Sequence, residues 1–342
     1  MKTFDEVFED KTKYGTKIKA SEYRDSGLHL IIDQGQRSVA GYTNLKEGLF
    51  EDVPAIIFGD HTRVVKYVDK PFFIGADGVK ILKSKIENAN YKYLYYALVN
   101  AKVPDTGYNR HFKWLREVKI NYPELTEQQK IVDILDKIEG IISEEKQQLE
   151  ELDMLVKARF VEMFGDTSVN PRGLPTLAWK DVFVTTTGKL DSNAMVLGGQ
   201  YPFFTCAKEQ LWIDQYAFDC EALLLAGNNA AGIYDVKHYK GKFNAYQRTY
   251  VLRLRNENWS YKLFQRQLED KLEYLKSQSK GSNTRYLTLE ILNRLQFIVP
   301  DIGEQQQFSA FVYKVEKLKI DVQRALDETQ KLFNSLMQQY FG

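Results

Sequence analysis

The string Gly59-Asp60-His61-Thr62-Arg63 is the stretch of this sequence whose residue types come closest to an active site. A carboxylate beside an imidazole is a pairing used in general acid–base catalysis. The same residues also suit a turn in which Asp60 caps the chain and Arg63 points outward. We favour the turn, because the corresponding stretch Gly227-Asn228-Asn229 lacks both acid and histidine. A repeated catalytic site would keep its chemistry, whereas a repeated binding loop can change its side chains.

Other catalytic signatures are missing from the sequence. It has no phosphate loop of the form Gly-x4-Gly-Lys-Ser/Thr and no Gly-x-Gly-x-x-Gly fingerprint after a strand. The 4 histidines do not cluster, which argues against a metal site. Cys206 and Cys220 are too few for a disulfide framework or a zinc knuckle, and favour a reducing compartment. The sequence therefore predicts a protein that is not an enzyme and holds no metal.

Asn, Gln and Arg side chains recur in the loops of both halves of the chain, and these side chains can read base edges through paired hydrogen bonds. Nearby lysines would contact phosphates, which adds affinity without sequence information. Any single residue could equally be a turn-forming amide or a solvated charge, so the prediction rests on the set. The predicted DNA-binding residues are Gln34, Gln36, Arg37, His61, Arg63, Lys66, Asn109, Arg110, Lys113, Lys189, Asn193, Lys208, Asn228, Asn229, Lys242, Asn244, Gln247, Arg248, Asn283 and Arg285.

The chain contains an internal repeat. Pro123 precedes Glu127-Gln128-Gln129, and Pro300 precedes Glu304-Gln305-Gln306, with an offset of 177 residues. The same offset relates the two Phe-Gly pairs, Phe164-Gly165 and Phe341-Gly342. Weaker matches lie upstream, where Phe58-Gly59-Asp60 aligns with Ala226-Gly227-Asn228. Each half is thus predicted to be a globular block followed by a helical block.

Apolar residues spaced three and four apart follow both Glu-Gln-Gln motifs and predict two long helices. Thr126 is the expected N-cap of the first helix, with Gln129 as its capping-box partner, and Gly165 is the expected C-cap. An antiparallel coiled coil between the helices would bring Glu145 and Lys319 close together in mid-seam; separate packing of each helix on its own domain is the alternative. The predicted seam residues are Ile131, Leu135, Ile138, Ile142, Leu149, Leu152, Val156, Phe308, Val312, Val315, Val322, Leu326, Phe333 and Leu336.

The globular blocks combine short β-rich runs with one helix each, expected near residues 90–101 and 260–276. The predicted fold is α+β, with two globular α/β domains separated by two long antiparallel helices in a pseudo-twofold repeat. The predicted segments are a globular block at 1–123, a helix at 124–166, a globular block at 167–299 and a helix at 300–342.

Charge follows the same division. The chain has a net charge of +1, but residues 1–123 and 167–299 carry +4 and +5, whereas residues 124–166 carry −7. The basic blocks suit a polyanion, and the acidic helix suits a protein partner. The charged N-terminus and the lack of a long apolar run predict a cytoplasmic protein without a signal peptide or membrane span.

The repeated Pro-x3-Glu-Gln-Gln motif, followed by a heptad helix ending in Phe-Gly, resembles the specificity (S) subunit of type I restriction-modification enzymes. Segments within residues 41–80 and 188–250 are similar to two different classes of that family's target recognition domains. The resemblance covers essentially the whole chain. The chain is short for the family and its first recognition domain begins almost at Met1, so we expect the N-terminal extension of larger members to be missing.

The resemblance implies a protein without catalysis of its own. Each recognition domain would read one half of a split, asymmetric target in double-stranded DNA, with half-sites about 10 bp apart. The helix pair would dock two methyltransferase subunits, and restriction subunits would join them. S-adenosylmethionine, ATP and Mg would be held by those partners, and this chain would need no cofactor.

Three alternatives remain open from the sequence. The chain could be the specificity subunit of a type II system whose partner fuses methylase and nuclease. It could be a stand-alone nuclease using Asp52, Asp60 and His61. It could also be a coiled-coil adaptor with two folded ends, which predicts no DNA binding.

Overall fold

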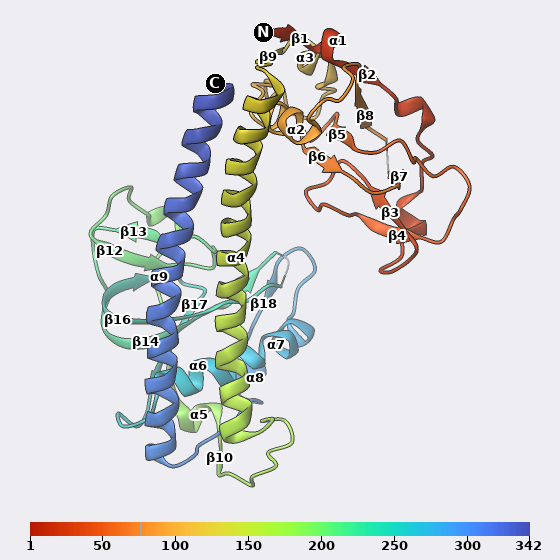
Figure 1. Cartoon of the computed structure of the whole chain (residues 1–342). Coiled ribbons are helices and arrows are strands. Elements are labelled where there is room, and N and C mark those ends of the chain that lie inside the picture. The colour runs from red at the N-terminus through yellow and green to blue at the C-terminus, as the bar shows by residue number, and fades with distance from the viewer. Residues whose placement is uncertain (76, 231) are drawn as a thin grey trace. The chain divides into compact units, whose positions relative to one another are not determined.

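The computed structural model describes residues 1–75, 77–230 and 232–342. Ala76 and Ala231, which belong to the motif segments compared above, lie outside the described residues. The chain divides into two compact units, residues 1–146 with 324–342 and residues 147–323. Both units include part of each long helix, α4 (Leu125–Phe164) and α9 (Ile302–Phe341) (Figure 1). Within the described chain, no helix combines the length and apolar character needed to cross a membrane.

The first unit is built around a four-stranded antiparallel sheet of order β2-β8-β5-β6. Its central strand β5 (Ala55–Gly59) is buried throughout, which explains its continuous apolar sequence. A second sheet has the order β4-β3-β7, with β3 parallel to β7. The other elements of this block are β1 (Lys2–Thr3), α1 (Phe4–Val7), β2 (Phe8–Asp10), two 3₁₀ helices (Thr12–Tyr14 and Ala20–Glu22), β3 (His29–Ile32), β4 (Gly41–Thr43), β6 (Val65–Val68), β7 (Phe72–Ile74), β8 (Val79–Ser84), α2 (Tyr91–Val99), α3 (Phe112–Leu115) and β9 (Lys119–Ile120).

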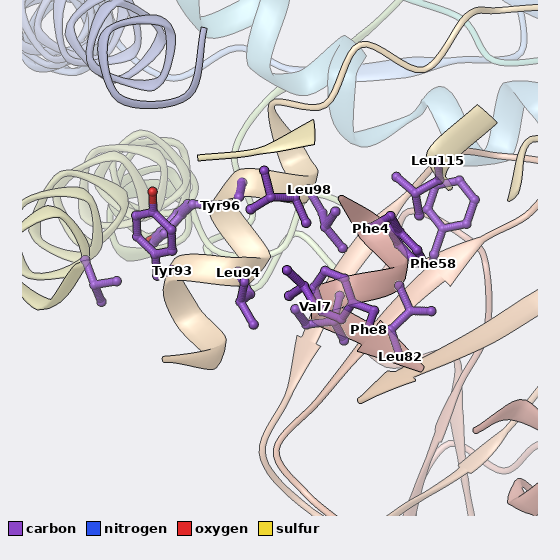
Figure 2. Close-up of a cluster of buried hydrophobic side chains, with 14 of the residues drawn as sticks. Phe4, Val7, Phe8, Phe58, Leu82, Tyr93, Leu94, Tyr96, Leu98 and Leu115 are labelled. Atoms are coloured by element: carbon purple, nitrogen blue, oxygen red, sulfur yellow. The ribbon is translucent and has the colours of Figure 1, made fainter. Parts of the chain in front are cut away.

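The core of this unit joins the sheet to its helices. Figure 2 shows Phe4 and Val7 of α1 beside Phe8 of β2, and the side chains of α2 extending the same cluster. The cluster continues onto the long helices, with Leu135 of α4 and Met337 of α9 both buried in it. The sheet and the helix ends are therefore held by one shared core.

The second unit contains a six-stranded sheet of order β11-β17-β14-β16-β12-β13. Its first four strands repeat the order of the four-stranded sheet, with β14 (Phe218–Ala226) in the place of β5. The expected helix at 260–276 is divided into α6 and α7 at Lys271. The elements of this block are β10 (Thr176–Ala178), α5 (Trp179–Val182), β11 (Phe183–Thr187), a 3₁₀ helix (Ser192–Ala194), β12 (Tyr201–Phe204), β13 (Leu211–Ile213), β15 (Asn228–Asn229), β16 (Val236–Ala245), β17 (Thr249–Leu254), α6 (Tyr261–Asp270), α7 (Leu272–Gln278), β18 (Arg285–Tyr286), α8 (Leu289–Leu292) and β19 (Gln296–Ile298).

The repeated Glu-Gln-Gln motif has a structural explanation. The amide of buried Gln128 donates to the Pro123 carbonyl at 2.8 Å, and that of buried Gln305 donates to the Pro300 carbonyl at 2.8 Å. Each glutamine thus binds the proline carbonyl that immediately precedes its helix. The Gln305 oxygen also accepts from the Ser260 amide at 3.0 Å, which ties the start of α9 to the start of α6.

The α+β fold and the two long antiparallel helices are confirmed. All of the predicted seam residues are buried or partly buried. In the first unit Leu135 shares a core with Phe333 and Leu336, and in the second Phe308 packs edge-on against Phe160 at 5.5 Å. Phe160 and Met337 are seam residues that the apolar spacing missed.

Two details of the helices differ from expectation. Helix α4 begins at Leu125, so Thr126 lies in its first turn and does not cap it. Glu145 accepts from the Thr329 hydroxyl at 3.3 Å, and Lys319 pairs with Asp153 at 2.7 Å. The antiparallel register therefore gives each mid-seam charge a partner other than the predicted one. Gly165 ends α4 with a φ of 75°, as expected of a C-cap.

Candidate nucleic-acid interface

Four loops of the first unit meet at the end of β5, and they carry most of the predicted DNA-binding residues of that unit. The Gln34 side chain accepts from the His61 amide at 3.1 Å and donates to the Asp77 carbonyl at 2.9 Å. The His61 ring nitrogen Nδ1 lies 3.2 Å from the Asn109 carbonyl oxygen. The sequence-predicted residues Gln34, His61 and Asn109 are thus brought together, although they are distant in the chain.

Asp60 is a structural residue. Its side chain is buried, and its Oδ1 accepts from the amide of Phe112, the first residue of α3, at 2.7 Å. Its carbonyl accepts from the His111 amide at 2.8 Å. Asp60 therefore caps the start of α3, a distant segment, and not its own turn as the sequence predicted. The proposed acid–base pair with His61 is not formed, because the two side chains have different partners.

The stand-alone nuclease is not supported. Asp52 and Asp60 lie at opposite ends of β5, and Asp52 pairs with Lys83 at 2.7 Å. Over the described ranges, no group of three His, Cys, Asp or Glu residues is arranged to hold a metal ion. The three residues named for that alternative therefore do not make one site.

Arg63 does not point outward as the turn predicted. Its guanidinium pairs with Asp105 at 2.6 Å and donates to the Val103 carbonyl at 3.4 Å. The Gly107 amide and the Arg63 guanidinium hold the pKa of the Asp105 carboxyl below its ordinary value. Arg63 has a φ of 60°, which turns the chain so that its side chain reaches the loop before α3.

Two predicted residues are buried and fully engaged within the protein. Lys66 is 7% exposed, pairs with Asp33 at 3.2 Å and donates to the Arg37 carbonyl. Asn244 is 4% exposed, donates to the Gln215 carbonyl at 3.0 Å and accepts from the Ala245 amide. These two side chains satisfy buried polar groups inside the protein, so neither belongs to the candidate interface.

A second loop cluster occupies the end of β14 in the other unit. Strands β15 and β18 pair Asn228 with Tyr286 and Asn229 with Arg285. The backbone N–H of Gln247 donates to the Leu190 carbonyl at 2.9 Å, which brings the 189–193 loop to the 246–248 turn. The cluster therefore gathers Asn193, Asn228, Asn229, Gln247, Arg248 and Arg285. Lys242 lies apart on β16, with its ammonium 4.7 Å over the Tyr216 ring.

Exposure sorts the remaining predictions. The predicted residues whose side chains are exposed are Gln36, Arg37, Asn109, Arg110, Lys113, Lys189, Asn193, Lys208, Lys242, Gln247, Arg248, Asn283 and Arg285. The predicted DNA-binding residues do not include one exposed aromatic residue of the first cluster, Tyr108. Tyr108 lies directly before Asn109 and stacks on the His61 ring with centroids 4.8 Å apart. Its place in the string Gly107-Tyr108-Asn109-Arg110, directly before two predicted contacts, is the signal that the sequence offers.

The two clusters share a backbone frame. The Asp60 amide donates to the Gly78 carbonyl at 2.6 Å, and the Gly227 amide donates to the Arg248 carbonyl at 2.8 Å. The carbonyls of Asp60 and Gly227 accept from His111 and Leu287, both at 2.8 Å. Asp60 therefore corresponds to Gly227, one residue away from the alignment based on matching glycines. The same frame carries different side chains in each unit.

Sequence comparison supports this repeat. The model of the family described as the type I restriction modification DNA specificity domain matches residues 1–154 and again residues 175–329. The chain belongs to this family. The two matched ranges coincide with the two halves of the repeat, so each half is a copy of the type I DNA specificity domain.

Individual relatives agree with the family. The specificity subunit of the type I restriction enzyme EcoDI from Escherichia coli is 36% identical over 150 residues, covering 42% of this chain and 32% of the relative. The EcoR124I/EcoR124II specificity subunit of the same organism is 29% identical over 150 residues, covering 40% of this chain and 37% of the relative. The matches thus span about a third of these relatives.

A solved structure shares the fold of the specificity family. The type I restriction-modification S subunit from M. genitalium matches with a TM-score of 0.63 and 15% identity, covering 100% of this chain and 95% of that one. At this identity the likeness is one of fold.

Proposed function

We propose that this chain is the DNA-specificity subunit of a type I restriction-modification system. The observation that carries the proposal is the doubled specificity domain, in which one backbone frame presents different loop side chains in each copy. Two readers with different side chains suit a target with two different halves. We take residues 1–123 and 167–299 as the two target recognition domains.

In this role the chain recognises DNA and leaves the chemistry to its partners. Exposed amides, arginines and lysines of the loop clusters contact bases and phosphates of the two half-sites. The long helices dock two methyltransferase subunits, and restriction subunits join that complex. S-adenosylmethionine, ATP and Mg belong to those partners. A base-flipping methyltransferase needs such a scaffold to hold the duplex while the target base is extruded.

The acidic character of residues 124–166 supports the division of labour. This segment has a net charge of −7, which is repelled by phosphates and suits a protein surface. The basic recognition blocks suit DNA. The curated relatives named above are type I specificity subunits, which favours a type I system over the type II alternative.

Methylation mapping tests the proposal. The full chain is expressed with the methyltransferase of its own system, and the host DNA is sequenced for methylated adenine. A single split motif, methylated in both halves, is the expected result. An unsplit motif, or no methylation by a folded complex, would contradict the proposal. The coiled-coil adaptor that does not bind DNA would then be the favoured hypothesis.

A further inference from the structure

Tyr108 is the most exposed aromatic side chain among the large hydrophobic residues that the structure describes, at 88%. A single exposed tyrosine is ordinary on a protein surface. This one, however, lies parallel to the His61 ring, with an interplanar angle of 9° and centroids 4.8 Å apart. The two rings form a small stack at the tip of the first loop cluster.

The loop that carries Tyr108 is fixed on both sides of it. Before it, Asp105 is held by Arg63 at 2.6 Å and accepts from the Gly107 amide at 3.0 Å. After it, the Asn109 side chain donates to the Thr106 carbonyl, and the Asn109 carbonyl faces the His61 ring. Gly107 takes a φ of 75°, which lets the chain reverse at the tip. An exposed ring on an ordered loop has already given up conformational entropy that binding would otherwise cost.

The neighbouring polar groups are engaged within the protein. Both ends of the Gln34 amide bind backbone groups, and the Arg63 guanidinium binds Asp105 and Val103. Gln34 thus holds the His61 loop and Arg63 holds the loop that carries Tyr108, while the Tyr108 ring itself faces solvent. Apolar side chains are used against base edges and between base steps in protein–DNA complexes.

We infer that Tyr108 contacts the DNA of the half-site read by the first unit, and that Arg63 is a positioning residue for the Tyr108 loop. The inference rests on the proposed function and adds a specificity-determining residue to it. The Tyr108 ring packs against the bases or sugars next to those that Arg110 contacts, with His61 supporting its other face.

Affinity for the duplex carrying the mapped motif tests the role of Tyr108. The probe is that duplex with a fluorescent label, bound by the full chain assembled with its methyltransferase. Tyr108→Ala is expected to weaken binding about 5-fold to 150-fold, the range for loss of one specific side-chain contact to bases in a duplex. Tyr108→Phe should recover most of the loss, because it restores the ring. Leu28→Ala is the matched control, since Leu28 is 69% exposed and lies before β3, at the end opposite to Gln34.

The result separates the inference from the proposal beneath it. Tyr108→Ala should also relax discrimination against base changes in one half of the motif and leave the other half unchanged. If wild type methylates a split motif but Tyr108→Ala binds and discriminates as wild type does, the Tyr108 inference is overturned and the proposed function stands. If wild type recognises no motif, both fall.

Variants of Asp105 and Arg63 test whether Arg63 positions the Tyr108 loop or contacts phosphate. If Arg63 positions the loop, Arg63→Ala and Asp105→Ala should weaken binding to similar extents, and the double variant should be no weaker than either. The dependence of affinity on salt should keep its slope. If Arg63 contacts phosphate, Arg63→Ala lowers that slope by about 1, and Asp105→Ala leaves binding unchanged or stronger because it removes a negative charge. That second pattern would overturn the positioning role.

Discussion

At the scale of single residues, buried polar side chains stabilise the starts of the two long helices. Gln128 and Gln305 occupy the same place in the two copies of the specificity domain, each bound to a proline carbonyl. Their surroundings differ, because Gln305 also binds the Ser260 amide, whereas the Gln128 Oε1 has no hydrogen-bond partner among the described atoms. We therefore expect the two glutamines to contribute unequally to the free energy of unfolding.

Replacement of these glutamines should show that inequality. Gln305→Ala leaves the Ser260 amide and the Pro300 carbonyl without their partner, and we expect a loss of about 2–4 kcal/mol in the free energy of unfolding. Gln128→Ala removes one hydrogen bond and should cost less. Urea denaturation of both variants checks this. Equal losses would mean that the second hydrogen bond contributes nothing.

His238 should make the second unit sensitive to acid. Burial and the charge of Lys262 lower its pKa below the ordinary value, against the opposing effect of Glu221 at 2.9 Å. As the pH falls below about 6.5, the unfolded chain takes up a proton at this site before the folded protein does. The contribution of neutral His238 to the free energy of unfolding is therefore fully present above that pH and is lost as the pH falls toward the lowered pKa.

The urea midpoint at pH 7.5 and pH 5.5 measures this effect. Wild type is expected to lose stability between the two, and His238→Gln should lose less. A fall of the same size in both proteins would place the acid sensitivity elsewhere.

The long helices dominate the element scale. Each has 40 residues, which at 1.5 Å per residue gives a rod about 60 Å long. A solitary helix of this composition would expose its apolar stripe to water, so the stripe packs against the partner helix. Outward-facing apolar residues such as Ile134 and Ile141 remain exposed beside the seam, on the surface that we propose docks the methyltransferase.

Adjacent residues of α4 should separate the two faces. Leu135 is fully buried, and Leu135→Ala should lower the free energy of unfolding by about 2–5 kcal/mol. Ile134 is 40% exposed, and Ile134→Ala should change it by about 0.5 kcal/mol or less. Thermal or urea denaturation of the two variants checks the difference. A loss as large for Ile134→Ala would contradict the proposed packing face.

At the scale of the whole molecule, the proposed function divides DNA recognition between two copies of one domain. Because each copy has its own core and loop cluster, we expect one copy to be replaceable without altering the other. The proposed bipartite target follows from this organisation.

Exchange of residues 1–123 for the corresponding segment of another family member tests that division. The methylated motif should change in one half and keep the other half. Sequencing of methylated host DNA reads both halves at once. A change in both halves would show that the two copies do not read independently.

The sequence by itself determined the repeat, the two helices and their seam. These features depend on spacing along one chain, and the 3–4 periodicity from Ile131 to Val156 predicts a buried face without knowledge of what covers it. It also limited the candidate readers to amides and basic residues in loops. The sequence could not distinguish side chains proposed to contact DNA from side chains that hold the loops in place. It also aligned Gly59 with Gly227, whereas the hydrogen bonds at the strand ends pair Asp60 with Gly227.

Only the tertiary structure decided which polar side chains are available. Arg63 is occupied because Asp105, distant in the chain, is brought beside it, and Asn244 is occupied because the Gln215 carbonyl needs a donor. Whether a side chain faces water or a partner depends on contacts between distant segments, which local spacing does not encode. The same contacts leave the Tyr108 ring exposed on an ordered loop.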